Sequence, residues 1–135
     1  MAILLAAGCG SRPPIIRVDG MTIEQRDDEQ ALVRFDVVLE NPNDTELVLE
    51  NFDYRVGAGT GGFRAERRAG FTLPPLAVVP TSLPAVVPAD ALEGPIPING
   101  RLFWFSREDA QRAFYLAGWI RPRTGFAASW RPEGP

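Results

Sequence analysis

The chemistry open to this chain is limited by the residues that it lacks. Among its 135 residues there is no histidine, all fourteen basic residues are arginine, and Cys9 is the single cysteine. Serine and cysteine nucleophiles therefore lack a histidine base, Schiff-base chemistry lacks its lysine, and zinc lacks the ligands that it prefers. The seventeen carboxylates remain as acid and base groups of the kind that a glycosidase uses.

The carboxylates are not spaced as a catalytic or metal site. Most of them alternate with apolar residues or stand in expected loops, where contact with water accounts for them. The acidic run at residues 27–29 is not followed by the six or more oxygen ligands that a calcium loop supplies, so we interpret it as a solvated hairpin tip. We predict no catalytic residue, no metal and no cofactor, and an enzyme is the least favoured class.

A glycine-rich segment, residues 57–62, formally matches the Gly-x-Gly-x-x-Gly pattern of dinucleotide-binding proteins. That pattern needs a following helix and an acidic residue about twenty positions later. Residues 63–69 are too few for the helix and are rich in arginine, so we predict a hairpin without a nucleotide. The arginines are scattered along the chain and the net charge is -3, which argues against a nucleic-acid partner.

The segment before Cys9 has the composition of a targeting signal. Residues 3–8 read Ile-Leu-Leu-Ala-Ala-Gly and lead directly to Cys9, after which the chain is polar and contains proline. This arrangement resembles the lipobox of bacterial lipoproteins, with Ala6 where leucine is usual. The resemblance implies residues 1–8 as a signal peptide, cleavage before Cys9 and a diacylglyceryl thioether on that cysteine. A short buried strand with a structural cysteine is the alternative.

The apolar run is too short to span a bilayer as a helix, so the implied contact with the membrane is through acyl chains on Cys9. Residues 9–14 would then form a lipidated tether. By the same resemblance, the absence of aspartate at Gly10 and Ser11 implies sorting to the outer membrane, with the domain facing the periplasm.

Residues 15–130 carry the period of two that is typical of strands. Apolar side chains occupy the odd positions from Ala31 to Leu39, a segment that we expect to pair with residues 15–23 through a polar loop at 25–30. Prolines and glycines, thirteen of each, separate short apolar runs. We predict a mainly β antiparallel sandwich of about seven strands, followed by a disordered tail, residues 131–135.

The run Asn41-Pro42-Asn43-Asp44 is a turn motif that must end this strand. Proline presets the backbone for a turn, and asparagine and aspartate side chains can hydrogen-bond to neighbouring backbone groups. Beyond the motif, apolar residues occupy odd positions up to Leu49 and even positions from Phe52. The inward face therefore changes between Glu50 and Asn51, which requires a bulge or a bend there.

Further short motifs surround this turn. They are the Leu-Glu-Asn-Pro-Asn-Asp run, a Leu-x-Leu strand, a Phe-x-Tyr-x-Val strand, a glycine-rich hairpin near Gly62, a proline before a strand near Pro80 and a Gly-Arg-Leu-Phe run from Gly100. Together they resemble the WHy (water stress and hypersensitive response) domain of the late embryogenesis abundant group 2 proteins, over residues 15–130. The resemblance implies an immunoglobulin-like or fibronectin-III-like sandwich fold, an association with desiccation and stress tolerance, and no catalytic residues.

Prolines and aromatic residues predict the edges and the cover of the sandwich. Pro84 cannot donate to a sheet ladder, so the strand at residues 81–87 is expected to lie at an edge or to turn that position outward. Both faces of residues 102–105 are apolar and need cover. A short helix from Ser106 to about Leu116, with Ser106 and Asp109 as its capping box, would supply it. A last strand is expected at residues 125–130.

Three classes of function remain open from these patterns. The leading one is a monomeric, non-enzymatic envelope lipoprotein whose sandwich binds or protects protein clients. The second, a lipid-handling or envelope-assembly lipoprotein, needs an apolar groove, for which the candidate lining residues are Trp104, Tyr115, Trp119 and Phe126. An ordinary core is the favoured interpretation of these aromatic side chains, because aromatic residues are mostly buried for packing. The third class, a carbohydrate-active enzyme, lacks the residues for its chemistry.

Overall fold

The fold is built almost entirely from strands. The computed structural model describes residues 11–57, 62–107 and 122–132. Within these ranges lie seven strands and one short 3-10 helix: β1 (Ile15–Arg26), β2 (Gln30–Glu40), β3 (Leu47–Val56), β4 (Phe63–Leu73), β5 (Val78–Pro88), η1 (Ala89–Glu93), β6 (Ile96–Ser106) and β7 (Arg123–Trp130).

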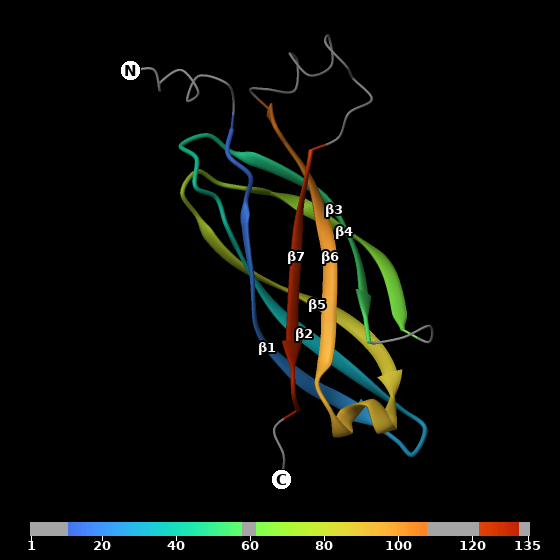
Figure 1. The fold of residues 1–135 in the computed structure, drawn as a ribbon. Coiled ribbons are helices and arrows are strands. Elements are labelled where there is room, and N and C mark those ends of the chain that lie inside the picture. The colour runs from blue at the N-terminus through green and yellow to red at the C-terminus, as the bar shows by residue number, and fades with distance from the viewer. Residues whose placement is uncertain (1–10, 58–61, 108–121, 133–135) are drawn as a thin grey trace.

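The strands form two antiparallel sheets on either side of one hydrophobic core (Figure 1). The first sheet has three strands in the order β1-β2-β5, and the second has four in the order β4-β3-β6-β7. The sheet edges approach each other where β1 lies alongside β7 and β4 alongside β5. This architecture confirms the predicted antiparallel β-sandwich of about seven strands.

The two ends of the sandwich differ in what they carry (Figure 1). The start of β1, the β2–β3 turn and the β4–β5 turn lie together at one end, which we call the turn end. The β1–β2 hairpin and η1 lie at the other, which we call the hairpin end. η1, which the sequence patterns do not predict, fills the connection between β5 and β6. None of its side chains is fully buried, but Ala91 and Leu92 pack partly buried against the core.

The predicted hairpin between β1 and β2 is confirmed, but its loop is shorter than residues 25–30. β1 continues to Arg26, and Oδ1 of Asp27 accepts the backbone N–H groups of Glu29 and Gln30 at 2.8 and 2.9 Å. The N–H of Gln30, and next that of Glu29, lower the pKa of the Asp27 carboxyl. This carboxylate is therefore part of the hairpin's own hydrogen bonding.

The core follows the predicted alternation. On β2, the odd positions from Ala31 to Leu39 are all at most 1% exposed. On β3, the register shifts between Leu49 and Asn51 against both neighbouring strands, so the predicted bulge is confirmed at Glu50. The extra residue moves the inward face from odd to even positions, and this change brings Tyr54 into the core.

Three prolines line the free edge of the first sheet. β5 pairs only with β2 in that sheet, which confirms the predicted edge position. Pro80, Pro84 and Pro88 stand opposite Val38, Arg34 and Gln30 in an unbroken register. Their spacing of four places all three where a backbone N–H would point away from β2, so no ladder bond is lost. The missing donors also disfavour pairing with the edge of another sheet.

The predicted helix from Ser106 falls almost wholly on residues outside the described ranges. Ser106, its expected cap, is the buried last residue of β6. Within β6, Leu102 and Trp104 face the core, and Phe103 and Phe105 are half-buried on the outer face. The predicted last strand is confirmed as β7, which begins two residues earlier than expected.

Gly100 is the position in β6 where a side chain has no room. A Cβ added there would come within 2.6 Å of the carbonyl oxygen of Asp53 and within 2.6 Å of Cβ of Tyr54. Because one of these atoms belongs to the backbone, rotation of a side chain cannot relieve the overlap. Glycine at this position therefore allows β6 to approach β3 closely.

Gly100→Ala should destabilise the fold by about 3 kcal/mol or more, because β6 must move away from β3. Gly125→Ala is the matched control, since a Cβ there meets its nearest atom at an ordinary 3.7 Å. Urea unfolding followed by circular dichroism measures both. Equal unfolding midpoints for the two variants would contradict the close approach.

Candidate functional site

The side chain of Asn41 lies buried at the turn end and holds two turns together. It is 1% exposed. Its Nδ2 donates to the carbonyl oxygens of Thr45, Leu73 and Pro74 at 2.9, 3.1 and 3.0 Å. Two hydrogens serve three acceptors, so at least one of these bonds is three-centred. The amide thus joins the β2–β3 turn to the β4–β5 turn, although Leu73 lies 32 residues further along the chain.

Asn43 connects this amide to the N-terminal segment. Oδ1 of Asn41 accepts from the backbone N–H and from Nδ2 of Asn43, at 2.9 and 2.8 Å. Asn43 also exchanges two bonds with the backbone of Arg12: its Oδ1 accepts the N–H at 2.8 Å, and its Nδ2 donates to the carbonyl at 2.9 Å. Pro14 is buried as well. The folded unit therefore begins earlier than the predicted residue 15, within the segment expected to be only a tether.

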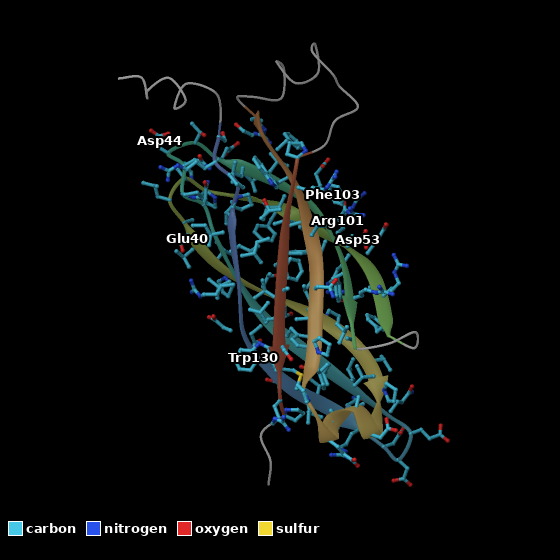
Figure 2. The ribbon with its side chains drawn as sticks, viewed as in Figure 1. Glu40, Asp44, Asp53, Arg101, Phe103 and Trp130 are labelled. Atoms are coloured by element: carbon cyan, nitrogen blue, oxygen red, sulfur yellow. The ribbon has the colours of Figure 1, made fainter. Side chains whose placement is uncertain are left out.

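The four residues of the predicted turn motif contribute unequally. The turn does end β2 at Glu40, as expected, and Asn41 and Asn43 do bond to neighbouring backbone. Pro42 is half-buried, while Asp44 is exposed and makes no hydrogen bond with the described residues (Figure 2). The two asparagines therefore supply the side-chain hydrogen bonds of the motif.

Three large apolar side chains are exposed at the same end. Ile15, Leu76 and Val78 are 46, 67 and 58% exposed, and we call them the apolar rim. Ile15 and Val78 stand on either side of Glu40 in the first sheet. Leu76 has φ of 57°, in the left-handed region that costs a non-glycine residue about 1 kcal/mol. The backbone of Asn43 accepts its N–H, which holds it in this conformation.

Tyr54 links the two sheets. Its hydroxyl donates to the carbonyl oxygen of Pro84 on β5, while its ring packs at 6.2 Å from that of Phe63. The carbonyl is available because Pro84 turns its backbone groups away from β2 at the sheet edge. Burial raises the pKa of Tyr54 above its ordinary value of 10.0, and the charge of Arg67 partly opposes this shift.

The structure describes two of the four aromatic residues that were considered for a groove. Trp104 is 8% exposed and its Nε1 donates to Oγ1 of Thr124 at 3.0 Å. Phe126 packs edge-on against Phe52 at 6.1 Å. Both side chains belong to the core or its margin, which agrees with the ordinary-core interpretation and not with a groove. Tyr115 and Trp119 lie outside the described residues, as does Cys9.

The other candidate sites receive no support from the geometry. β4 follows the glycine-rich segment directly, where a dinucleotide site needs a helix, so the match of residues 57–62 to that pattern is formal only. In the described part of the chain, no three carboxylate or cysteine side chains are grouped to hold a metal ion. A helix able to cross a bilayer is also absent from these ranges.

One pocket of about 390 Å³ lies at the hairpin end, between η1, the start of β6 and the β3–β4 hairpin. Its lining is mainly apolar and includes Val56, Phe63, Val87, Ile96 and several prolines and glycines, with Asp90 at the same site. This volume lies at the small end of the range for ligand pockets.

Comparison with known proteins supports the fold and nothing finer. No family model and no curated protein sequence matches the chain significantly. An X-ray structure of a structural genomics target aligns with a TM-score of 0.61 at 14% identity, covering 87% of this chain and 86% of the other. The Bordetella pertussis protein provisionally named ApaA aligns at 0.58 and 14%, covering 92% and 99%. A protein of Arabidopsis thaliana solved in solution aligns at 0.51 and 11%, covering 91% and 83%.

The chain shares the fold of these proteins. At such low identities the likeness concerns the backbone alone, and it assigns no activity. The comparisons therefore support the two-sheet sandwich fold, and they say nothing about the surface residues of this chain.

Asn41→Ala should destabilise the protein by at least about 3 kcal/mol, because several buried carbonyl groups lose their donor together. Asp44→Ala, in the same turn, removes no hydrogen bond with the described residues and should change stability by less than about 0.5 kcal/mol. Pro42→Ala and Asn43→Ala should fall between them. Thermal melting orders the four variants, and a wild-type midpoint for Asn41→Ala would contradict the role of its amide.

Tyr54→Phe should cost about 1 kcal/mol near neutral pH, because it removes the bond to Pro84. A raised folded-state pKa means that the contribution of Tyr54 is fully present below pH 10.0 and is lost as pH rises through the folded-state value. The stability difference between wild type and variant should therefore shrink at alkaline pH. Urea unfolding at a series of pH values tests this, and a constant difference would contradict it.

Proposed function

We propose that the chain is a lipid-anchored protein of the bacterial envelope whose sandwich is a binding or protective module and not an enzyme. The observation that carries the proposal is the pair of bonds between Arg12 and Asn43. It fastens a residue only three positions after Cys9 to the turn end. Three residues span at most about 10 Å. A lipid on Cys9 would therefore hold the turn end close to the membrane.

The apolar rim supports this orientation. Ile15, Leu76 and Val78 are exposed at the end to which Arg12 is bound. Exposed apolar side chains are unfavourable in water and favourable in the interfacial region of a bilayer. Acyl chains on Cys9 would supply the main attachment, and the rim would add contact without spanning the membrane. The hairpin end would then point away from the bilayer.

The protective role is the part of the proposal that rests on the resemblance to the WHy domain. The asparagine turn supports it, since this turn joins the two sheets through a buried hydrogen bond of Asn41 and holds the N-terminal segment through an exposed bond of Asn43. Such a module would present folded surfaces to clients at a fixed distance from the membrane. It would need no cofactor, and we propose that it acts as a monomer.

A lipid-handling role is the second candidate, and the apolar pocket near η1 is the observation that favours it. The pocket is large enough for part of an acyl chain or another small apolar molecule, but it lies at the end away from the proposed anchor. A native mass spectrum of protein taken from its own membrane distinguishes the roles, because only the second predicts a bound, releasable lipid.

With a basic segment added before Ile3, the chain should partition into detergent in a host that processes bacterial lipoproteins. Cys9→Ser should move it to the aqueous phase or leave it uncleaved, because the thioether is the main attachment. Asn43→Ala is the control, since it releases Arg12 without changing the lipidated residue. Membrane fractionation measures all three, and identical partition of wild type and Cys9→Ser would show that the lipobox interpretation is wrong.

A further inference from the structure

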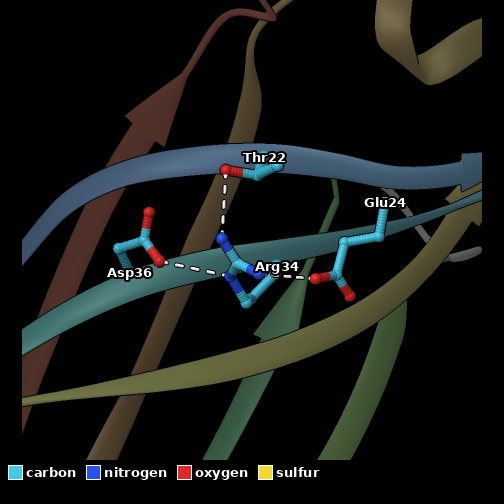
Figure 3. A network of polar contacts seen from close by, with 4 residues as sticks. All are labelled: Thr22, Glu24, Arg34 and Asp36. Atoms are coloured by element: carbon cyan, nitrogen blue, oxygen red, sulfur yellow. Dashed lines mark hydrogen bonds and ion pairs between the residues drawn. The ribbon is translucent and has the colours of Figure 1, made fainter.

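Arginine side chains on the outer faces of the sandwich differ in whether they have a carboxylate partner. On the first sheet, Arg34 contacts Glu24 at 2.5 Å, Asp36 at 3.3 Å and Thr22 at 3.4 Å (Figure 3). On the second sheet, Arg55 and Arg64 are exposed and form no ion pair with any carboxylate of the described residues. Arg34 is therefore surrounded by acceptors, whereas Arg55 and Arg64 have no carboxylate partner among the described residues.

The register places the two unpaired arginines directly opposite each other. Arg55 on β3 pairs with Arg64 on β4, and its partner on the other side is Asn99 on β6. Like charges directly across a strand pair destabilise a sheet. No carboxylate of the described residues bridges them, so an anion from outside the chain is the group that would relieve their repulsion.

A hollow already exists at this position. It has a volume of about 210 Å³ and is lined by Asp53, Tyr54, Arg55, Arg64, Asn99, Gly100 and Arg101. Arg101 is held in place by Asp53 at 3.4 Å and lies 5.5 Å from the centre of the Phe103 ring (Figure 2). The three guanidinium groups outnumber the one carboxylate, which Arg101 already pairs. The hollow therefore combines Arg101, which is held by an ion pair, with Arg55 and Arg64, whose guanidinium donors have no carboxylate partner in the described ranges.

We propose that this hollow binds a phosphate-bearing anion, with Arg55 and Arg64 as its main ligands and Asn99 and Arg101 beside them. A guanidinium presents two parallel N–H donors that match two oxygens of a phosphoryl group. The proposal does not depend on the lipid anchor. Arg55 lies eight residues along β3 from Leu47, which corresponds to about 26 Å of strand from the turn end. A small phosphorylated solute therefore fits the site better than a lipid headgroup of the anchoring membrane.

The test is a titration of the full chain, carrying Cys9→Ser, with inorganic pyrophosphate at constant ionic strength. Amide resonances of Asn99, Gly100 and Arg101 should shift in a saturable manner. Arg55→Gln and Arg64→Gln should each weaken binding by about tenfold, the effect of losing one charge-assisted contact. Arg68→Gln is the matched control, because Arg68 is exposed on the same strand and face but does not line the hollow. It should bind as wild type does.

A second readout separates a specific site from general attraction. Pyrophosphate should raise the melting temperature of wild type and of Arg68→Gln, but not of Arg55→Gln or Arg64→Gln. In chloride alone, those last two variants should melt at or above the wild-type temperature, because the repulsion is gone.

Three results would overturn the proposal. One is the absence of saturable shifts, and another is equal weakening by all three arginine variants, which indicates diffuse attraction over the whole face. The third is binding to vesicles of phosphatidylglycerol without binding to pyrophosphate, which makes a headgroup the ligand. None of these results bears on the anchor at Cys9, since the titrated chain lacks that residue.

Discussion

The buried amide of Asn41 is the interaction on which the arrangement of this sandwich depends. An unpaired amide in a core costs free energy, so its five side-chain hydrogen bonds favour one geometry of the surrounding backbone. They fix where β2 ends and where β4 ends, and through Asn43 they connect to the two bonds that hold Arg12. Polar bonds join the two sheets at this end, and apolar packing supplies most of the contact between them. The second polar link between sheets, from Tyr54 to Pro84, lies further along β3 and depends on the bulge at Glu50.

The candidate functional regions lie on different surfaces of the molecule. The turn end carries the apolar rim and the proposed approach to the membrane, and the hairpin end carries η1 and an apolar pocket. The outer face of the second sheet carries the unpaired arginines. A single attachment at the turn end would leave the other two regions accessible, which is the arrangement that a tethered binding module requires.

Much of the fold could be predicted because its causes are local. The alternation on β2, the phase change before Phe52 and the edge position of Pro84 each follow from the period of two and from the missing proline N–H. The asparagine turn could be located, but the burial of Asn41 could not be foreseen. Its acceptors on Leu73 and Pro74 come from a turn more than thirty residues later. Turn asparagines usually bond to their own neighbours, so no short-range pattern distinguishes one that reaches a distant turn.

The candidate surfaces show the same limit. The hollow at Arg55 requires residues of β3, β4 and β6 in a particular register, and scattered arginines in the sequence do not reveal it. The bond between Arg12 and Asn43 likewise joins residues that are 31 positions apart in the sequence. Sequence patterns therefore locate strands and turns well, and they locate sites poorly when several strands contribute one residue each.

Hydrogen exchange of the Asn41 side-chain amide tests the central role of this residue most directly. Its two Nδ2 protons can be resolved by nuclear magnetic resonance and compared with the backbone amides of core residues such as Val37 and Leu39. If the amide holds the sandwich together, its protons exchange only when the whole domain unfolds, at the rate of the slowest core amides. Exchange as fast as that of an exposed asparagine would show that the turn opens independently and that the fold does not depend on it.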